Sequence, residues 1–243
     1  MKKVLKVSFI IFLAFLTLGI GGCFFVSKKL PVGVKSSKTD TMIQTMNEAL
    51  NKAAWDSTRY VKWTFQDNHH YVWDKDENLA QVSWKDNRVL LDPDEVTGVA
   101  YAQNVKQSGK DAEKLVKKAW GFWCNDMFWL IAPFKVNDPG VTHELVEDEN
   151  GERLKVTYNS GGVTPGDSYV WSFDEEGRPK EYEMYVGVFP IKGISVPWEN
   201  WKKITSGALI STAHGPMLSM EGVQGGMELS DVGLTNDIWA EIR

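Results

Sequence analysis

The segment YVKWTFQDNHHYVWDKDENLAQVSWKDNRVLLD, Tyr60 to Asp92, decides the fold class. Large apolar residues alternate with polar ones along it, in the pairs Trp63/Phe65, Tyr71/Trp73, Val82/Trp84 and Val89/Leu91. A period of two residues is typical of strands that bury one face. The intervening segments QDNHH, DKDEN and KDNR are rich in turn-forming residues. The segment therefore predicts an antiparallel meander with one face lined by tryptophan.

A helix is predicted downstream of the meander. Its apolar positions recur at the spacing of one helical face: Ala112, Leu115, Val116, Ala119, Trp120 and Trp123. The next stretch is FWCNDMFWLIAPFKVNDPG, Phe122 to Gly140. We expect the helix to end at FWC, ND to turn the chain and MFWLIAPFKV to enter the sheet. Pro133 then indicates an edge or a bulge, because proline cannot donate a hydrogen bond to a neighbouring strand.

The remaining segments complete an α+β pattern. A first helix is predicted after Thr39 or Asp40 from the spacing of Met42, Met46, Ala49, Leu50 and Ala53. Strand-like segments follow Gly140, namely THELVED, RLKVTYN, DSYVWSFD, KEYEMYVGVF, VPWENWKKI, ALISTA and MELSDV. We expect one large curved antiparallel sheet, a half-barrel of roughly 10–11 strands, with about two helices packed on its concave side.

The N-terminal segment is predicted to meet a membrane. Val7–Val26 contains no charge over twenty residues, and lysines stand on both sides of it. Twenty apolar residues are long enough to cross a bilayer as a helix. Ile20–Cys23, IGGC, also resembles a lipobox, in which Cys23 would be lipidated and the preceding residues removed. An uncleaved signal anchor, a lipoprotein and plain secretion therefore stay open.

These predictions divide the chain into three parts. Residues 1–30 are a signal anchor or lipoprotein signal segment and would form an N-terminal hydrophobic helix, residues 31–40 are a tether, and residues 41–243 are a single β-rich domain. The anchored protein is expected in the cell envelope, with its domain extracytoplasmic, on the periplasmic side. Whether the membrane is the inner or the outer one is left open.

Charge and cysteine content exclude several partners. The chain has 27 basic and 32 acidic residues, and residues 1–30 take five of the lysines and no acid, which leaves a formal charge of −10 beyond them. Nucleic-acid binding and adhesion to anionic lipid through charge both favour basic surfaces, so neither is expected. Cys124 is the only cysteine beyond that segment, so no disulfide can form within the domain.

No motif predicts catalysis, a metal or a cofactor. Cys124 could act as a nucleophile only with a histidine base, but its apolar neighbours should raise its pKa and deactivate it. HELVE (143–147) has glutamate in place of the second histidine of a zinc motif and suits a strand. DKDEN (74–78) lacks the glycine and the final glutamate of a calcium loop. The four histidines are His69, His70, His143 and His214, and the tandem pair is expected on the surface beside a turn.

The glycine-rich segment NSGGVTPGDSY (159–169) precedes a strand rather than the helix that a phosphate loop requires, so a wide hairpin loop is expected.

The large aromatic residues are the remaining signal of a binding site. They either fill the core or line a cavity for an apolar ligand, and both interpretations stay open. The candidate ligand-lining residues are Trp63, Trp73, Trp84, Trp120, Trp123, Phe128, Trp129 and Trp171.

Two segments carry a family resemblance: CNDMFWLIAPFKVNDPGV and GGVTPGDSYVWSFDEEGRP. Together with AAWDSTRYVKWTF, HHYVWD and VLLD they resemble a family of uncharacterised, membrane-attached bacterial envelope proteins, over most of residues 40–200. That family is more distantly similar to the lipoprotein-carrier fold, a half-barrel of about eleven antiparallel strands closed by helices. The resemblance implies this fold and an envelope location, and it carries no activity.

The expected function is that of a non-enzymatic, membrane-anchored envelope protein that binds a lipid or a lipoprotein acyl chain in a tryptophan-lined half-barrel. An alternative is a structural or interaction module of an envelope complex without a ligand cavity, whose protein partner is unknown. A hydrolase that uses Cys124 or a histidine is the third hypothesis. No cofactor is expected.

Overall fold

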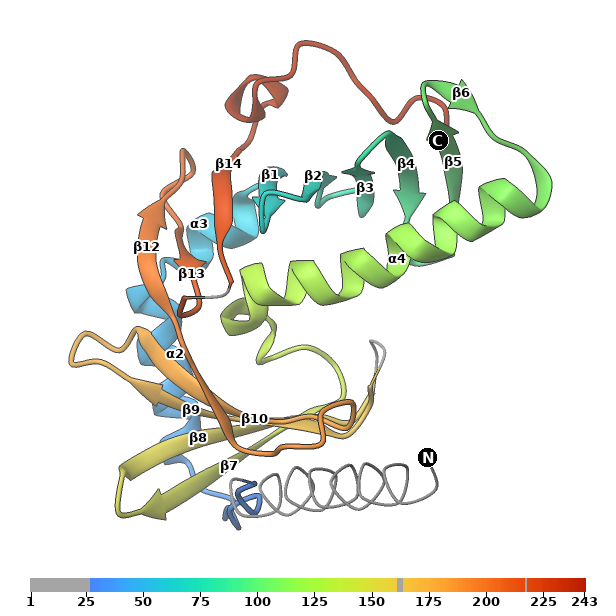
Figure 1. Ribbon diagram of the computed structural model, residues 1–243. Helices are drawn as coiled ribbons and strands as arrows, with labels where there is room; N and C mark the ends of the chain where they lie inside the picture. Colours follow the sequence, from blue (N-terminus) through green and yellow to red (C-terminus); the bar gives the residue numbers. More distant parts are fainter. Residues whose placement is uncertain (1–26, 161–163, 217) are drawn as a thin grey trace, which may run out of the picture.

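The computed structural model describes residues 27–160, 164–216 and 218–243. The first half of the chain forms two short helices, a meander and one long helix (Figure 1): α2 (Lys38–Ala49), α3 (Lys52–Ser57), β1 (Tyr60–Phe65), β2 (His69–Asp74), β3 (Leu79–Trp84), β4 (Asn87–Asp92), β5 (Thr97–Ala102), β6 (Val105–Lys106), α4 (Gly109–Ile131) and the 3-10 helix η1 (Ala132–Lys135). The second half is mostly strands: β7 (Val141–Asp148), β8 (Gly151–Tyr158), β9 (Asp167–Phe173), β10 (Pro179–Tyr185), β11 (Ile194–Pro197), β12 (Glu199–Lys203), β13 (Leu209–Ala213), β14 (Met220–Gly226) and the 3-10 helix η2 (Leu229–Val232).

The predicted meander is confirmed as the centre of a seven-stranded antiparallel sheet with the order β14-β1-β2-β3-β4-β5-β6. In register, Trp63 of β1 lies opposite Tyr71 of β2, which lies opposite Val82 of β3. The large apolar side chains therefore share one face of the sheet, as the two-residue period requires.

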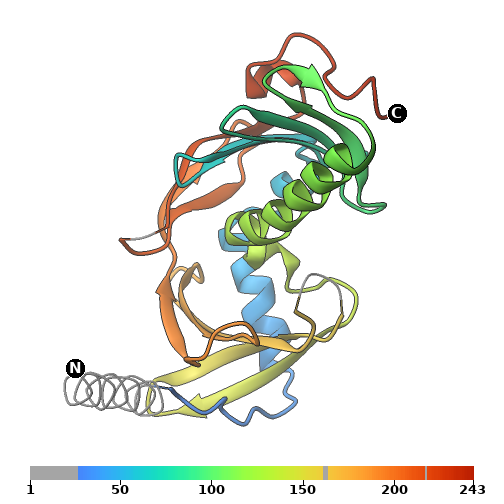
Figure 2. The same cartoon turned by 45° about the vertical axis from the view of Figure 1, so that its right-hand side comes forward.

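The other strands form a five-stranded sheet with the order β11-β10-β9-β8-β7 and a two-stranded sheet of β12 and β13. None of the three sheets is closed. Figures 1 and 2 show α4 running between the two larger sheets, so that each of them turns one face towards this helix. The α+β class with a large antiparallel sheet and few helices is therefore confirmed, whereas the strands are divided among three sheets instead of one.

The long helix differs most from the sequence prediction. The stretch MFWLIAPFKV was expected to be a strand, but α4 continues to Ile131 and η1 follows it. Pro133 lies in the first turn of η1, where proline is tolerated because the missing N–H has no partner in the helix. The reason for the error is burial on both sides: Leu130 and Ile131 are buried, as are Ala132 and Phe134, so no polar face marks the helical period.

Several strand boundaries also differ. β5, β6 and β14 were not predicted, and MELSDV, expected as a strand, contributes to η2 instead. VPWENWKKI, expected as one strand, is split into β11 and β12 at Trp198. The segment of the first predicted helix forms two helices, α2 and α3, which break at Asn51 in a left-handed conformation with φ of 52°.

Both ends of the described chain pack against the sheets, the N-terminal segment at the edge strand β7 and the C-terminal segment on β1. Residues 31–40, predicted as a tether, are docked: Val34 exchanges backbone hydrogen bonds with Leu145 of β7 (2.9 and 2.8 Å), and α2 already begins at Lys38. At the other end, Trp239 is fully buried and stacks on Tyr60 of β1 with the ring centroids 6.0 Å apart. The C-terminal segment therefore covers the outer face of the seven-stranded sheet.

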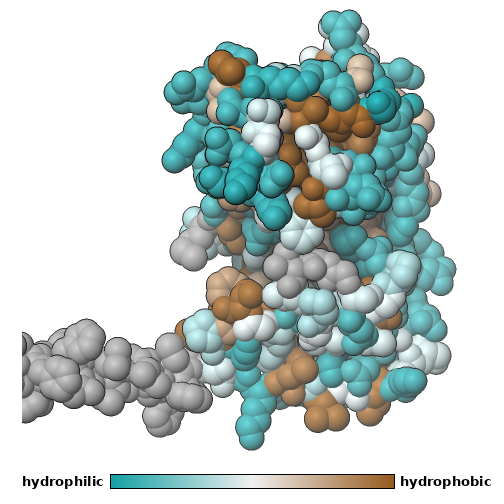
Figure 3. All heavy atoms as spheres, turned by 90° about the vertical axis from the view of Figure 1, so that its right-hand side faces the viewer, coloured by the Kyte–Doolittle hydropathy of each residue, from teal (hydrophilic) through white to brown (hydrophobic). Residues whose placement is uncertain are grey.

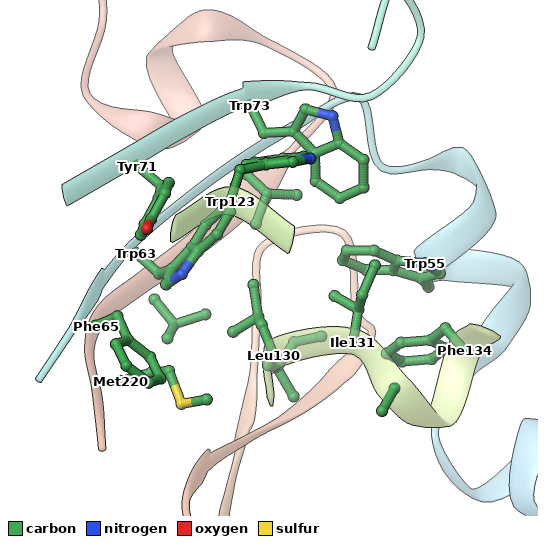
Figure 4. Packing of buried hydrophobic residues seen from close by; sticks show 14 of the residues in the cluster. Trp55, Trp63, Phe65, Tyr71, Trp73, Trp123, Leu130, Ile131, Phe134 and Met220 are labelled. Atoms are coloured by element: carbon green, nitrogen blue, oxygen red, sulfur yellow. The ribbon is translucent and has the colours of Figure 1, made fainter. Parts of the chain in front are cut away.

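The space between α4 and the seven-stranded sheet is filled by aromatic rings (Figure 4). Trp63 stacks on Tyr71 with centroids 4.5 Å apart, and both contact Trp123 of α4, at 5.8 and 6.1 Å. Trp73 meets Trp123 edge to face at 5.2 Å. Close-packed rings of this size contribute strongly to the core, and they leave this half of the molecule solid.

Within residues 27–160, 164–216 and 218–243, no helix combines the length and the apolar composition needed to cross a membrane. The predicted anchor, Val7–Val26, and the candidate lipidation site Cys23 lie outside these residues.

Candidate functional site

A pocket of about 690 Å³ lies between the C-terminal half of α4 and the inner face of the five-stranded sheet. The loop after η1 and the loop after β10 form its other walls. Figure 3 shows the side of the molecule that lies to the right in Figure 1, where hydrophobic side chains (brown) are exposed among hydrophilic ones (teal). Ligand pockets of small proteins have volumes of roughly 300–1,000 Å³, so this one is large enough for a small molecule or a lipid chain.

One face of α4 forms the first wall. Lys117, Gly121, Cys124 and Phe128 line the pocket and recur every three or four residues, which places them on one side of the helix. The opposite side carries Ala119 and Trp123, which are buried against the seven-stranded sheet. The helix therefore presents a buried apolar face to the seven-stranded sheet and, to the pocket, a face on which the small residues Gly121 and Cys124 lie among larger ones.

The sheet forms the second wall through residues that alternate along two strands. Tyr169 comes from β9, and Tyr182 and Met184 come from β10, with Val186 in line after its end. Phe128 of α4 contacts Tyr169, with ring centroids 5.1 Å apart. The wall is therefore mostly aromatic and aliphatic, which suits an apolar ligand.

Two phenol groups are the unpaired polar groups of this wall. The hydroxyls of Tyr158 and Tyr182 are buried, and within the described residues neither has a hydrogen-bond partner. Burial raises the pKa of both phenols well above the ordinary value, so both remain protonated donors. A buried hydroxyl without a partner is costly, and an acceptor atom on a ligand would satisfy it.

Three of the four charged residues that line the pocket are already paired, whereas Lys117 has no ion pair within the described residues. Lys135 forms an ion pair with Asp138 in the loop after η1. Asp167, at the start of β9, accepts hydrogen bonds from the Thr164 hydroxyl and from the backbone N–H of Gly187 (2.6 Å). The second contact fixes the loop after β10 to the sheet. These carboxylates therefore shape the pocket wall instead of offering a free charge to a ligand.

The structure separates the aromatic residues predicted to line a ligand site into two groups. Trp120, Phe128 and Trp129 line the pocket. Trp63, Trp73, Trp84, Trp123 and Trp171 are buried in the core, and none of them is among the pocket-lining residues. Of these, Trp171 contacts a pocket residue: it packs edge to face on Tyr182 with centroids 4.8 Å apart.

Cys124 lies within α4 and not at its end, and its thiol borders the pocket. Burial raises the pKa of this thiol to about 11, against the opposing effect of the Lys135 ammonium. Within the described part of the chain no hydrogen bond joins it to a histidine. A catalytic thiol requires the opposite shift, so Cys124 has the character of a buried apolar residue.

His69 departs from the surface position expected for it. Its Nδ1 lies 2.6 Å from Oδ2 of Asp126 on α4, and the same oxygen accepts a hydrogen bond from the Tyr71 hydroxyl (2.6 Å). The His69 side chain is 13% exposed and its ring stacks on Phe122 at 3.8 Å. His70 points the other way and meets the Thr64 hydroxyl, as the alternation along a strand requires. The buried cluster joins α4 to β2.

The other two histidines also have structural contacts. His143 of the HELVE segment lies on β7, where its Nε2 is 2.7 Å from the carbonyl oxygen of Val136. His214 is buried, with its ring nitrogens 3.1 Å from the Pro197 oxygen and 2.9 Å from the Trp129 oxygen. In the described ranges no group of three or more histidine, cysteine or acidic side chains is placed to hold a metal ion.

The two loop motifs have the structural roles expected of them. DKDEN forms the turn between β2 and β3, where Asp74 accepts hydrogen bonds from the backbone N–H groups of Asp76 and Glu77 and pairs with Arg59 at 2.9 Å. The glycine-rich segment precedes β9, a strand, and no helix begins there.

Sequence reasoning missed the tyrosines of the pocket. Tyr158, Tyr169 and Tyr182 are brought together by the pairing of β8, β9 and β10, with Tyr169 and Tyr182 rings 5.0 Å apart. The available signal was the alternation in DSYVWSF and KEYEMY, which places Tyr169 and Tyr182 on the same face as their bulky neighbours.

No protein-family model matches the chain, and no curated protein matches it. The resemblance to membrane-attached envelope proteins stays a prediction.

Proposed function

We propose that this protein is a non-enzymatic, membrane-anchored envelope protein that binds a lipid or lipoprotein acyl chain in the pocket between α4 and the five-stranded sheet. The observation that carries the proposal is the pocket itself, about 690 Å³ with walls of aromatic and aliphatic side chains. An acyl chain is the ligand chemistry that such walls favour, because its burial is driven by the hydrophobic effect.

The unpaired hydroxyls of Tyr158 and Tyr182 support an amphipathic ligand over a pure hydrocarbon. Both hydroxyls are buried. Neither hydroxyl oxygen is exposed to the pocket in this structure, so the rings would have to turn towards the pocket before a carbonyl or ester oxygen at the head of an acyl chain accepts their hydrogen bonds. Such hydrogen bonds would remove the cost of leaving the hydroxyls unpaired. The chain of the ligand would then extend along Phe128 and Met184, which line the same pocket.

The arrangement of the sheets supports the half-barrel of the lipoprotein-carrier fold. β11 and β12 are separated by Trp198, whose backbone N–H still donates to Lys180 of β10 (2.8 Å). An isolated bridge between Ala213 and Ser219 joins the end of β13 to the start of β14. The three sheets therefore follow one another around α4 (Figure 2), as the strands of a half-barrel surround a helix on its open side.

The cysteine and histidine chemistry supports a non-enzymatic role. The pKa of Cys124 is raised to about 11, and the described histidines contact carbonyl oxygens, a hydroxyl or a buried carboxylate in the core. An activated thiol needs a lowered pKa and a base within reach. Neither condition is met around the pocket.

Gly121 offers a sharp test of ligand binding. It lines the pocket from the middle of α4, and a Cβ atom built on it has no heavy atom within 4 Å. Gly121→Phe would therefore start from an unobstructed Cβ and place a ring in the pocket. Gly121→Ala is the matched control, because it removes the same glycine and adds a single methyl group.

Binding of a fluorescent fatty acid to the purified full chain in detergent measures the effect. We expect binding to the parent and to Gly121→Ala, and at least tenfold weaker binding to Gly121→Phe, which corresponds to about 1.4 kcal/mol. Equal binding by all three proteins would show that the fatty acid sits elsewhere. Absence of binding to the parent would contradict the proposal and favour an interaction module without a ligand.

A further inference from the structure

The chain enters the domain beside the pocket. The Ser27 hydroxyl oxygen accepts a hydrogen bond from the backbone N–H of Lys192 (3.0 Å), and the backbone N–H of Lys28 donates to the Lys192 carbonyl (2.9 Å). Lys28 also pairs with Glu183 of β10 at 2.5 Å. The first described residues are therefore fixed to the loop that follows β10, residues 186–193.

This loop forms part of the pocket wall and exposes large apolar side chains. Val186, Val188 and Phe189 line the pocket, and Val188 and Phe189 are 66% and 45% exposed. The Lys192 ammonium donates hydrogen bonds to the carbonyl oxygens of Val186 and Phe189, so the loop directs its charge inward and its apolar side chains outward.

The adjoining N-terminal segment has the same character. Leu30 is 41% exposed, Val32 is 90% exposed and Val34 is 56% exposed. With Val188 and Phe189 they make five of the seven large apolar residues that are exposed in the described chain, and all five lie on the segments 27–36 and 186–193. Val34 pairs with β7 at the other edge of the sheet, so the apolar residues nearest the Ser27–Lys192 contact are Leu30, Val188 and Phe189. Single exposed apolar residues are ordinary, but several on adjoining segments indicate an interaction surface.

The sequence that precedes Ser27 identifies the partner. The uncharged apolar run Val7–Val26 ends directly before it. If the run is an uncleaved anchor, its end lies at the membrane surface. If Cys23 is lipidated, three residues stand between it and Ser27, so that four Cα–Cα steps give a reach of at most about 14 Å. Both alternatives hold residues 186–193 close to the lipid headgroups.

We propose that the loop 186–193 inserts Val188 and Phe189 into the surface of the bilayer that anchors this chain, so that the pocket opens onto that bilayer. The inference rests on the proposed anchor and adds the orientation of the domain and the route by which an acyl chain enters. Lys28, Lys29 and Lys35 are neighbours in sequence of the exposed apolar residues 30–34. In this orientation their ammonium groups would contact the lipid headgroups.

A nitroxide label reports the position of this loop. The full chain carrying Cys124→Ser and Val188→Cys is labelled and reconstituted in phosphatidylcholine vesicles. The control is Val105→Cys in the same background, because Val105 on β6 is 63% exposed and lies at the opposite end of the molecule (Figure 1). The Cys124→Ser protein alone corrects for any label on Cys23.

We expect the label at 188 to collide several-fold less with a water-soluble nickel chelate, and more with oxygen, than the label at 105. Equal accessibility at the two positions would overturn the inference, as would a chain that does not float with the vesicles. Fatty-acid binding by the unlabelled parent chain in detergent separates the two proposals, because Val188 and Cys124 themselves line the pocket. Binding together with a water-exposed position 188 contradicts the membrane orientation alone, whereas a buried position 188 without binding contradicts the proposed ligand alone.

Discussion

The two faces of α4 meet the two large sheets in different ways. On the side of the seven-stranded sheet, Trp63, Trp73 and Trp123 pack ring against ring. On the side of the five-stranded sheet, the helix carries the small residues Gly121 and Cys124 beside the rings of Trp120 and Phe128, and a pocket remains. Small residues on one face of a helix therefore leave room for a site, although large rings lie next to them.

The largest effect is expected where the rings are closely packed. Trp63 is 1% exposed, so Trp63→Ala should leave a large cavity and lower the free energy of unfolding by about 3–5 kcal/mol. Phe128→Ala, on the pocket side, removes a ring that already borders open space and should cost about 1 kcal/mol or less. Denaturant unfolding of both variants measures the difference. Equal losses would mean that the two halves are packed alike.

Cys124 tests the apolar character of the pocket. Its pKa, raised by burial from 9.0 to about 11, lowers the thiolate fraction near neutral pH about 100-fold. Alkylation at pH 7 should therefore be about 100-fold slower than for an exposed thiol, and a bound fatty acid should slow it further. Mass spectrometry of the alkylated peptide follows this cysteine separately from Cys23. A rate equal to that of a free thiol would contradict the buried setting.

His214 joins the end of α4 to the five-stranded sheet and should make the fold pH-dependent. Burial lowers its pKa to about 4, and the contacts with the oxygens of Pro197 and Trp129 oppose this lowering only in part. The unfolded chain, with an ordinary pKa of about 6.5, binds a proton that the folded ring excludes. The stability that His214 contributes is therefore complete above about pH 6.5 and is lost as the pH falls towards 4.

Between pH 7 and pH 5 this loss should be roughly 2 kcal/mol. His214→Asn should be less stable at pH 7 and should lack this part of the pH dependence, as measured by denaturant unfolding at several pH values. Identical pH profiles for the parent and the variant would show that the ring does not exclude a proton.

The smallest effect concerns two positions on opposite faces of α4. Gly121→Ala should raise the free energy of unfolding by about 1 kcal/mol, because alanine favours a helix and its methyl group meets no neighbour. Gly121→Phe should also be tolerated, whereas Ala119→Phe should destabilise by about 1–3 kcal/mol, since Ala119 is fully buried on the solid side. Thermal unfolding compares the three variants. Equal damage from both phenylalanines would contradict the pocket.

The sequence predicted the parts of the fold that depend on local patterns. The alternation from Trp63 to Leu91 identified the meander, since each strand buries one face. The same reasoning failed for MFWLIAPFKV, because a helix end buried on several sides has no polar period. The pocket could be predicted only in part. Phe128 and Trp129 stood out by their bulk, but the contact of Tyr158 with Tyr169 and Tyr182 depends on the pairing of three strands.

Contacts between distant segments explain the other differences. Asp126 and His69 are 57 positions apart, and no local pattern indicates that a carboxylate on α4 meets a ring on β2. The docking of residues 27–36 onto the sheet could not be predicted from the sequence either, because their proline, glycine and lysine content is typical of a linker. Both contacts are set by tertiary packing.

The most direct test of the central claim is a crystal structure of the protein with a bromine-labelled fatty acid. We expect anomalous bromine density between α4 and the five-stranded sheet, beside Phe128 and Met184, with the carboxyl group within hydrogen-bond distance of the Tyr158 and Tyr182 hydroxyls. Bromine density elsewhere, or an unchanged pocket without density at saturating fatty acid, would contradict the claim that this half of the molecule is a binding site.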